Sequence, residues 1–415
     1  MKVLALEAST ASAKAILYST KGGVLDVISL PYAEEVGDVI TLDAEGVYQT
    51  LVDCGKRVID RNNRKIDAIG LGCIWHSLLL LDKERKPLGR ISTWANTTAG
   101  ETARKYRKDK GLTKELYSRT GCMIHSFYPL WQYIHLREKE PERLEKAAYL
   151  SSQSQYIFER LTGEWAYSRS TAAGSGMMNI HTLEWDEDIL KLAGISRDMV
   201  APLQEPLYGA ALTETAARDL GLDASIPVII GGPDGALNQI GGGCMEEGHM
   251  TFSVGTSGAI RIPCDLPLLP ENPSTWCYYL AEGKWIAGAA TSGAGNCVEW
   301  FVKRIQRGKI SYDELESMMD AVDPRTAPIF LPFLYGERCP GWQDQRRGGF
   351  CGLDGSHDIG HLYYALLEGV LMNIYQCYEI LVRVGGAPKV IQISGGIENS
   401  TRWLQMAADI FQREW

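Results

Sequence analysis

One carboxylate, Asp234, lies in a glycine-rich stretch where side-chain cover is thin. The stretch from Val228 to Gly243, VIIGGPDGALNQIGGG, begins as an apolar run and ends in glycines. An apolar run that ends in Gly-Gly-Pro is typical of a strand followed by a turn. Asp is common in turns because its short side chain binds nearby backbone N–H groups. The alternative is that small neighbours let a ligand approach a carboxylate at a strand end, where open α/β sheets bind ligands.

Three loops consist of small residues (Gly, Ala, Ser or Thr) and could bind phosphate. Two lie between apolar arms, in residues 4–17 (LALEASTASAKAIL) and 249–262 (HMTFSVGTSGAIRI), and the third is the Gly-Gly turn that follows residues 389–394. Exposed backbone N–H groups and hydroxyls suit phosphate oxygens. None of the loops is a Walker A motif, which requires Gly-Lys-Ser/Thr. Each alone is also an ordinary tight turn, but the three together favour phosphate or nucleotide binding.

Two further segments contain side chains suited to a sugar. Residues 75–82, WHSLLLLD, place His76 at the start of a predicted strand, and residues 92–100, STWANTTAG, contain Trp94 and Asn96. An aromatic ring offers an apolar face, and an amide binds hydroxyls. Each residue also has a structural alternative: a satisfied histidine, a core tryptophan or a turn asparagine.

Hydrophobic patterning predicts the elements that must position these residues. In chain order they are strands at 3–8, 13–19, 24–32 and 65–74, a helix from an N-cap at Asp43 to Arg61, a mainly helical region at 97–220, a long helix at 358–384, a strand at 389–394 and a helix at 401–411. The pattern is that of an α/β protein.

The totals exclude several classes of protein. The chain has 415 residues, which suggests two or three domains, and a net charge of −9 without a long basic run, which disfavours nucleic acid or an anionic membrane as a partner. None of its ten cysteines forms a Cys-x-x-Cys pair, and they are expected to be reduced core thiols. The sequence shows no signal peptide and no run of ~18 apolar residues, so a cytoplasmic enzyme or binding protein is expected.

The two similar hairpins predict two similar lobes. We place the first at residues 1–243 and the second at 244–415. The sequence stops at Trp415 just after a predicted helix, whereas a lobe of this kind would need another strand and helix to close its sheet. The C-terminal lobe is therefore expected to be truncated.

The ordered motifs resemble the FGGY family of sugar kinases, and within it the gluconokinase branch. The matching segments are LEASTASAKA (6–15), WHS (75–77), STAAGSGMMNIHTLEWD (170–186), GGPDGALNQIGGG (231–243), SVGTSGAIR (253–261), PFLYGERCPGWQDQRRGGFCGLDGSH (332–357) and ISGGIENSTRWLQMAADIF (393–411). Among these, GERCPGW with its following Arg-Gly-x-Phe-x-Gly-Leu pattern is the most specific.

This resemblance implies a two-lobed actin-like, ribonuclease H-like α/β ATPase fold with a cleft between the lobes. It implies phosphoryl transfer from ATP, with Mg²⁺, to a small sugar or sugar acid, and gluconate conversion to 6-phosphogluconate is our first expectation. The implied roles are Asp234 as the general base; Trp75, His76, Asn96 and Asp234 at the sugar; Thr10, Ser12 and Lys14 at the first phosphate loop; Gly255 and Thr256 at the second; Gly295, Gly396 and Ser400 at the adenine nucleotide; and Glu7 holding the metal through water.

Four positions depart from the family pattern. Glu7 stands where the family has Asp, Ser9 where it has Gly, and Asn96 and Thr98 where it has Asp and Arg. Glu7 is one methylene longer than Asp, which changes the expected metal geometry, and the changes to Asn96 and Thr98 bear on the choice of sugar. A kinase for xylulose or another polyol, and a non-catalytic sugar- or nucleotide-binding relative, are therefore alternatives. The expected partner is a small molecule, with a homodimer possible.

Overall fold

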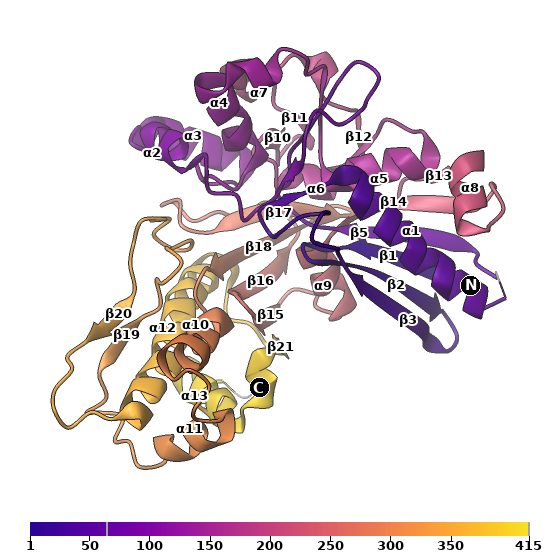
Figure 1. The fold of residues 1–415 in the computed structure, drawn as a ribbon. Coiled ribbons are helices and arrows are strands. Elements are labelled where there is room, and N and C mark those ends of the chain that lie inside the picture. The colour runs from indigo at the N-terminus through magenta and orange to yellow at the C-terminus, as the bar shows by residue number, and fades with distance from the viewer. Residues whose placement is uncertain (64, 414–415) are drawn as a thin grey trace. The chain divides into compact units, whose positions relative to one another are not determined.

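The computed structural model describes residues 1–63 and 65–413, which divide into two compact units. Unit 1 comprises Met1–Asn238 and Tyr278–Trp285, and unit 2 comprises Gln239–Cys277 and Ile286–Trp415 (Figure 1). Each unit contains its own main β-sheet with helices packed against it. The first unit thus ends after Asn238, where the sequence-based division is at residue 243, and it also takes in a short later segment.

Unit 1 is built on a six-stranded sheet in the order β13-β14-β5-β1-β2-β3. The strands are β1 (Lys2–Ala8), β2 (Ser12–Ser19), β3 (Gly23–Pro31), β5 (Ala68–Cys73), β13 (Gly209–Ala211) and β14 (Pro227–Pro233). Strand β1 is antiparallel to β2 and parallel to β5, and β5 is parallel to β14. The predicted opening hairpins and the fourth strand are present.

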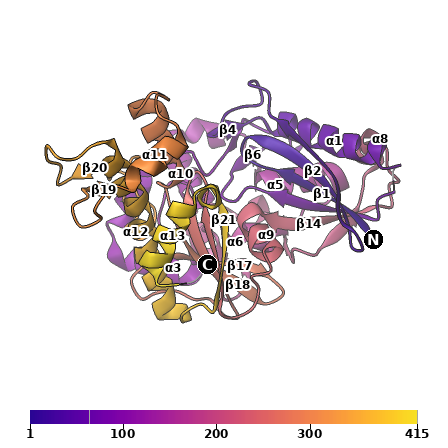
Figure 2. The same ribbon diagram turned by 90° about the horizontal axis from the view of Figure 1, so that it is seen from below.

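Helix α1 (Ala44–Arg61) covers this sheet and begins where the sequence predicts. The Asp43 carboxylate accepts a hydrogen bond from Gly46 N at 2.6 Å, which satisfies one of the free N–H groups of the first turn. The buried face of α1 packs on β1, β2 and β3 and against α8 (Glu214–Leu220), as Figure 2 also shows.

The remaining elements of unit 1 are short. The helices are α2 (Gly100–Arg107), α3 (Lys110–Thr120), α4 (Pro129–Lys139), α5 (Gln153–Thr162), α6 (Arg169–Ala173) and α7 (Glu187–Ala193), and α9 (Asp234–Gly241) begins at the end of the unit. The minor strands are β4 (Thr41–Leu42), β6 (Leu79–Leu81), β7 (Ile91–Ser92), β8 (Tyr149–Ser151), β9 (Tyr167–Ser168), β10 (Met178–Asn179), β11 (Glu184–Trp185) and β12 (Leu203–Gln204).

The main sheet of unit 2 has five strands in the order β17-β18-β16-β15-β21. They are β15 (His249–Val254), β16 (Gly258–Cys264), β17 (Trp276–Ala281), β18 (Lys284–Thr291) and β21 (Val390–Gly395), and the tip of the β17–β18 hairpin belongs to unit 1. The helices are α10 (Gly295–Trp300), α11 (Tyr312–Met319), α12 (Ile359–Gly385) and α13 (Thr401–Phe411), and a small sheet pairs β19 (Ile329–Leu331) with β20 (Gly349–Cys351).

The two sheets repeat one arrangement of strands. In unit 1, β1 lies between an antiparallel partner, β2, and a parallel one, β5. In unit 2, β15 lies between antiparallel β16 and parallel β21. The similar hairpins in the sequence therefore reflect two similar folds.

Helix α12 is the long helix predicted from residue 358. Asp358 caps it by accepting from His361 N at 3.1 Å. By length and composition alone α12 could cross a membrane, but 56% of its most apolar 18-residue stretch is buried inside the protein. It packs on β16, β19, α11 and α13, as expected of a core helix.

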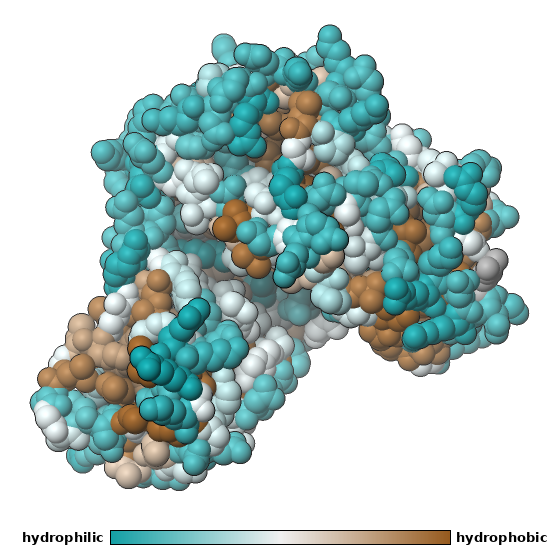
Figure 3. All heavy atoms as spheres, viewed as in Figure 1, coloured by the Kyte–Doolittle hydropathy of each residue, from teal (hydrophilic) through white to brown (hydrophobic). Residues whose placement is uncertain are grey.

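Elsewhere on unit 2, the apolar side chains of Ile329 and Leu331 are exposed, and apolar residues gather on the face seen in Figure 3.

Candidate active site

Three strands of unit 1 end in register at one edge of the sheet. Ala8, Cys73 and Pro233 are aligned partners on β1, β5 and β14. Glu7 precedes Ala8 on β1, and Asp234 follows Pro233 on β14, so both carboxylates lie at this edge. Strand β5 lies between β1 and β14. Neighbouring strands are about 4.8 Å apart, which separates β1 from β14 by roughly 10 Å. The predicted general base, Asp234, and the start of the first predicted phosphate loop therefore lie at this edge.

Asp234 is exposed, and the backbone before it is held in a conformation that needs glycine. Gly231 has φ +66°, and a Cβ there would lie 1.9 Å from the carbonyl oxygen of Leu71. This close approach coincides with a bulge in the pairing of β14 with β5. Asp234 opens α9, where Gly235 N donates to its Oδ1 at 2.7 Å. The local turn role and an accessible carboxylate are thus both present in the same residue.

The thiol of Cys73 lies at the same edge and is unreactive. Burial raises its pKa to about 12, and the nearby carboxylates of Asp234 and Glu7 also raise it. A protonated thiol is a poor nucleophile. Covalent chemistry at Cys73 is therefore not expected, and Asp234 remains the accessible acid–base group.

The first predicted phosphate loop is a closed turn between β1 and β2. Ser9 closes it, because its N and Oγ both donate to Ser12 O, at 2.9 and 2.8 Å. Glu7 and Lys14 are directly opposed across the hairpin and form an ion pair at 3.1 Å. Thr10 Oγ1 accepts from Trp94 Nε1 at 3.1 Å. The predicted residues Glu7, Thr10, Ser12 and Lys14 therefore lie together, and the Ser at position 9 takes part in the turn.

Trp75 and His76 follow β5 at this edge, but His76 does not begin a strand. Strand β5 ends at Cys73, β6 begins at Leu79, and His76 has φ +55°, which is incompatible with an extended strand. The prediction of a strand start was wrong because a turn is needed here to bring both rings onto α6. Trp75 Nε1 donates to Ser170 O at 3.1 Å, and His76 Nδ1 bonds to Gly174 O at 2.7 Å.

The bond to Gly174 fixes the chemistry of the His76 ring. A carbonyl oxygen can only accept, so Nδ1 carries the proton. In the neutral ring Nε2 is then an acceptor, suited to a sugar hydroxyl.

Aromatic rings surround His76 on several sides. The ring centroids of Phe127, Tyr128 and Tyr278 lie 4.7, 5.0 and 5.7 Å from that of His76. Tyr278 is also 5.0 Å from Trp75, and its hydroxyl lies 2.7 Å from that of Tyr128. The sequence analysis missed Tyr278, which comes from the β17–β18 hairpin. The aromatic run Trp276-Cys277-Tyr278-Tyr279 was the only available signal.

Asn96 lies in a different setting from Trp75 and His76. Its Nδ2 donates to Ser92 Oγ at 2.8 Å, and its Oδ1 accepts from Thr98 N and Oγ1 at 2.9 and 2.7 Å. Asn96 and Thr98 line a cavity of about 240 Å³, whose lining includes none of Trp75, His76 and Asp234. The structure therefore groups Asn96 with other polar residues.

In unit 2, the second predicted phosphate loop contacts the start of α10. Gly255 and Thr256 are exposed between β15 and β16. Gly295 N donates to Gly255 O at 2.9 Å, and Asn296 N donates to Thr256 O at 3.1 Å. A Cβ on Gly295 would lie 2.4 Å from Gly255 O, so this approach requires glycine. Gly255, Thr256 and Gly295 are brought together.

Gly396 joins this group, whereas Ser400 has a structural role. Val254 and Gly395 are register partners on the parallel strands β15 and β21, so Gly255 and Gly396 follow at the same sheet edge. Ser400 is buried, and its Oγ accepts from Trp403 N at 3.0 Å as the N-cap of α13. Its predicted contact with the nucleotide would thus be secondary to capping.

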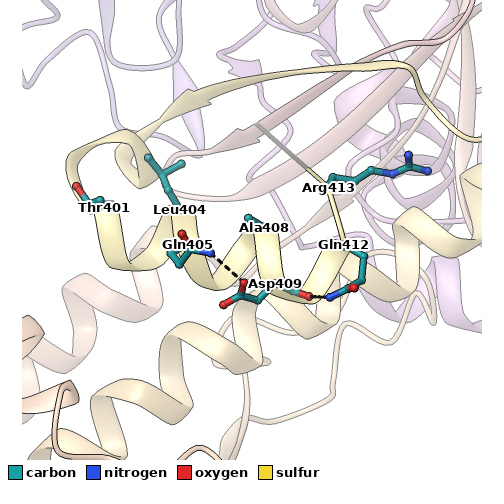
Figure 4. A pocket seen from close by; sticks show the side chains of 7 residues that line it. All are labelled: Thr401, Leu404, Gln405, Ala408, Asp409, Gln412 and Arg413. Atoms are coloured by element: carbon teal, nitrogen blue, oxygen red, sulfur yellow. Dashed lines mark hydrogen bonds between the residues drawn. The ribbon is translucent and has the colours of Figure 1, made fainter.

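The cavity drawn in Figure 4 lies along α13 and has a volume of about 630 Å³. Gln405 Nε2 donates to Asp409 Oδ1 at 2.9 Å along this helix. Its lining, from Thr401 to Arg413, includes neither Gly396 nor Ser400. It is therefore distinct from the group of glycines at the sheet edge.

The GERCPGW segment holds its own loop. Glu337 is buried and pairs with Arg346 at 3.1 Å, while Gly341 N donates to its Oε1 at 3.2 Å. Burial raises the pKa of Glu337, although the charge of Arg346 opposes this. Trp342 Nε1 donates to Ser274 O at 3.0 Å. The contacts of Glu337, Gly341 and Trp342 thus give this segment a structural role in folding the loop.

The metal expectation rests on Glu7. Within residues 1–63 and 65–413, no group of three or more His, Cys, Asp or Glu side chains could hold a metal ion. Magnesium at phosphate-transfer sites is usually held by one or two carboxylates plus the substrate phosphates. A single carboxylate beside a phosphate loop, such as Glu7, fits that kind of binding.

Comparison with known proteins agrees with this layout. Residues 2–241 match the N-terminal domain of the FGGY family of carbohydrate kinases, and residues 250–414 match its C-terminal domain. The chain is 32% identical to the gluconokinase of Bacillus licheniformis and 29% identical to a xylulose kinase of Bacillus subtilis, each over 99% of this chain and 83% of the relative. A crystal structure of gluconate kinase from Lactobacillus acidophilus matches with a TM-score of 0.92 at 26% identity, over 99% of this chain and 84% of that one.

The chain belongs to the FGGY family of carbohydrate kinases. The predicted two-domain, actin-like α/β fold is confirmed. Its substrate is accordingly a small carbohydrate, and its reaction is that of a kinase.

Gly174→Ala tests whether α6 positions Trp75 and His76. The backbone of Gly174 has φ −88°, which alanine tolerates, but the new Cβ would lie 2.6 Å from Trp75 Cδ1 and 3.0 Å from His76 Cε1. We expect KM for the sugar to rise about fivefold to tenfold, as a displaced ring costs about 1 kcal/mol or more. KM for ATP should not change. Gly89→Ala is the control, because its Cβ would meet nothing within 4 Å. An equal KM for the sugar in the two variants would contradict the prediction that α6 positions Trp75 and His76 for sugar binding.

Proposed function

We propose that the chain transfers the γ-phosphoryl group of ATP to a terminal hydroxyl of a sugar acid, with gluconate as the preferred acceptor and 6-phosphogluconate as the product. The observation that carries this proposal is the sheet edge of unit 1, which brings Asp234 together with the first phosphate loop and with Trp75 and His76. A carboxylate and a phosphate loop at one edge suit a kinase better than a binding protein that does no chemistry.

In this proposal Asp234 accepts the proton of the attacking hydroxyl. Its exposure leaves room for a sugar, and the bond from Gly235 N holds the carboxylate in place. His76 Nε2 accepts a hydrogen bond from a second hydroxyl of the sugar and thereby orients the sugar. Such positioning is the main contribution a protein makes to phosphoryl transfer.

Each unit contains a loop that would bind phosphate, partly exposed in unit 1 and exposed in unit 2. Thr10 and Ser12 would supply hydroxyls beside Lys14 in unit 1, and Thr256 and Gly396 would supply backbone N–H groups in unit 2. Gly255 N donates to Ser257 O at 3.1 Å, so Gly255 would contribute by shaping the loop. When bound, Mg²⁺ would neutralise phosphate charge, and Glu7 would orient it through water. Lys14, which pairs with Glu7 at 3.1 Å, would supply an ammonium group to the phosphates in unit 1.

Two considerations favour gluconate over xylulose. The identity to the gluconokinase of Bacillus licheniformis, 32%, exceeds that to the xylulose kinase of Bacillus subtilis, 29%. In addition, Asn96 and Thr98, which replace Asp and Arg of the family pattern, share a cavity with Arg90, His135 and Arg143. Cationic side chains favour an anionic substrate.

An ATP-consumption screen tests the choice of acceptor. It compares gluconate, xylulose, ribulose and glycerol at equal concentrations, and we expect the highest kcat/KM with gluconate. A clear preference for xylulose would favour the alternative xylulose kinase, and consumption with none of them would favour a non-catalytic relative.

Glu7→Asp tests the metal role. Asp is one methylene shorter and would no longer reach Lys14, which now lies 3.1 Å from Glu7. The carboxylate charge would then be freed for the metal. Because an exposed ion pair contributes about 1 kcal/mol or less, we expect the Mg²⁺ concentration at half-saturation to fall by about twofold to fivefold. Glu214→Asp, in the first turn of α8, is the control. Superimposable Mg²⁺ titrations of Glu7→Asp and wild type would remove Glu7 from the metal site.

A further inference from the structure

The cavity that Asn96 lines lies wholly within unit 1 and is built from distant parts of the chain. Its volume is about 240 Å³, enough for several waters or one end of a small acid. Its polar lining comes from β4, from β7 with the residue before it and the turn after it, and from α4 with the residues after α4: Thr41, Arg90, Ser92, Asn96, Thr98, Gln132, His135, Glu140 and Arg143. Such convergence of polar groups in a hollow is typical of a ligand site.

The charges around this cavity favour an anion. Arg90 and Arg143 are permanently positive, whereas Glu140 is the single acidic residue of the lining. Arg143 bonds to Glu140 at 2.8 Å, and His135 Nε2 lies 3.8 Å from the other oxygen of that carboxylate. The excess of positive charge therefore remains after Glu140 is paired.

The neutral polar groups favour a ligand that also has hydroxyls. Gln132 is buried, and its Nε2 donates to Thr93 O at 3.1 Å and to Phe127 O at 3.3 Å. Within the part of the chain that the structure describes, its Oε1 has no hydrogen-bond partner. A buried acceptor without a partner is costly, and a donor hydroxyl would satisfy it.

We propose that this cavity is a binding site for the carboxylate end of a small polyhydroxy acid. Arg143 and Arg90 supply the charge, and Ser92, Asn96 and Gln132 supply hydrogen bonds to hydroxyls. The proposal rests on the proposed function only in the choice of gluconate as the probe. The acid is either the substrate itself, extending into the cavity, or a second molecule bound beside it.

Two substitutions with opposite expected signs test the site. Arg143 is half exposed and bonds to Glu140, so Arg143→Gln should not affect folding. It should weaken gluconate binding by about threefold to tenfold, because a charged hydrogen bond at a partly screened position is lost. Glu140→Gln removes the opposing charge and frees Arg143, so it should strengthen gluconate binding by a similar factor. The matched control is Arg57→Gln, which breaks an exposed pair with Asp53 on α1, outside the cavity.

Binding is measured by calorimetric titration of the whole chain with gluconate and with glucitol, its neutral counterpart of equal carbon number. Glucitol affinity should stay within twofold of wild type in both variants. One gluconate per chain, with matching shifts in KM, identifies the acid as the substrate, and a second gluconate identifies a separate molecule. Unchanged gluconate affinity in both variants, equal shifts for glucitol, or no gluconate binding to wild type would overturn the proposal. Because binding is read directly, a lack of turnover contradicts only the proposed function.

Discussion

Asp234→Asn is expected to keep nucleotide binding and to lose about 10²–10⁴-fold in turnover, the usual effect of removing a general base. Asparagine has nearly the same shape, so Gly235 N can still donate to its side-chain oxygen as it does to Asp234 Oδ1. The amide cannot accept the hydroxyl proton, however. The measurement is kcat with gluconate beside the Kd for ATP.

The control for this substitution is Glu214→Gln, which also removes a carboxylate from the first turn of a helix of unit 1. It should leave turnover within twofold, because an exposed helix-terminal charge contributes about 1 kcal/mol or less, and to stability only. If Asp234→Asn turned over like Glu214→Gln, Asp234 would not be the base.

Gly295→Ala is expected to raise KM for ATP by about fivefold or more while KM for the sugar stays near wild type. The added Cβ would lie 2.4 Å from the carbonyl oxygen of Gly255, so the predicted phosphate loop must move. Overpacking of this kind costs about 1–3 kcal/mol, which corresponds to roughly fivefold to a hundredfold in affinity. The measurement is ATP affinity by titration, together with the sugar KM.

Gly355→Ala, also in unit 2, is the matched control, because nothing lies within 4 Å of its added Cβ. The melting temperatures of both variants distinguish a general loss of stability from a local displacement of the predicted phosphate loop. Wild-type ATP affinity in a folded Gly295→Ala protein would show that the loop does not bind phosphate.

Local patterns in the sequence predicted much of the fold. The opening hairpins, α1 with its Asp43 cap, and α12 with its Asp358 cap depend on neighbouring residues, and they occur as predicted. Asp234 at a strand end follows from the same kind of pattern. His76 does not, because its positive φ depends on a bond to Gly174, a residue 98 positions away.

The surroundings of the candidate site depend on contacts that no local pattern encodes. Tyr278 reaches Trp75 and His76 from a hairpin that the sequence places in the second lobe. The two arginines beside Asn96 come from the residue before β7 (Arg90) and from the segment after α4 (Arg143), where their spacing carries no periodic signal. The sequence therefore predicts the residues at the sheet edge better than their neighbours.

Mass spectrometry of the acceptor after incubation with ATP and Mg²⁺ tests the central claim most directly. We predict that gluconate gains one phosphoryl group in the presence of the wild-type chain, and that Asp234→Asn yields almost none of this product in the same time. Conversion of ATP to ADP and free phosphate with unmodified gluconate, or phosphorylated gluconate in equal amounts from both proteins, would contradict the account.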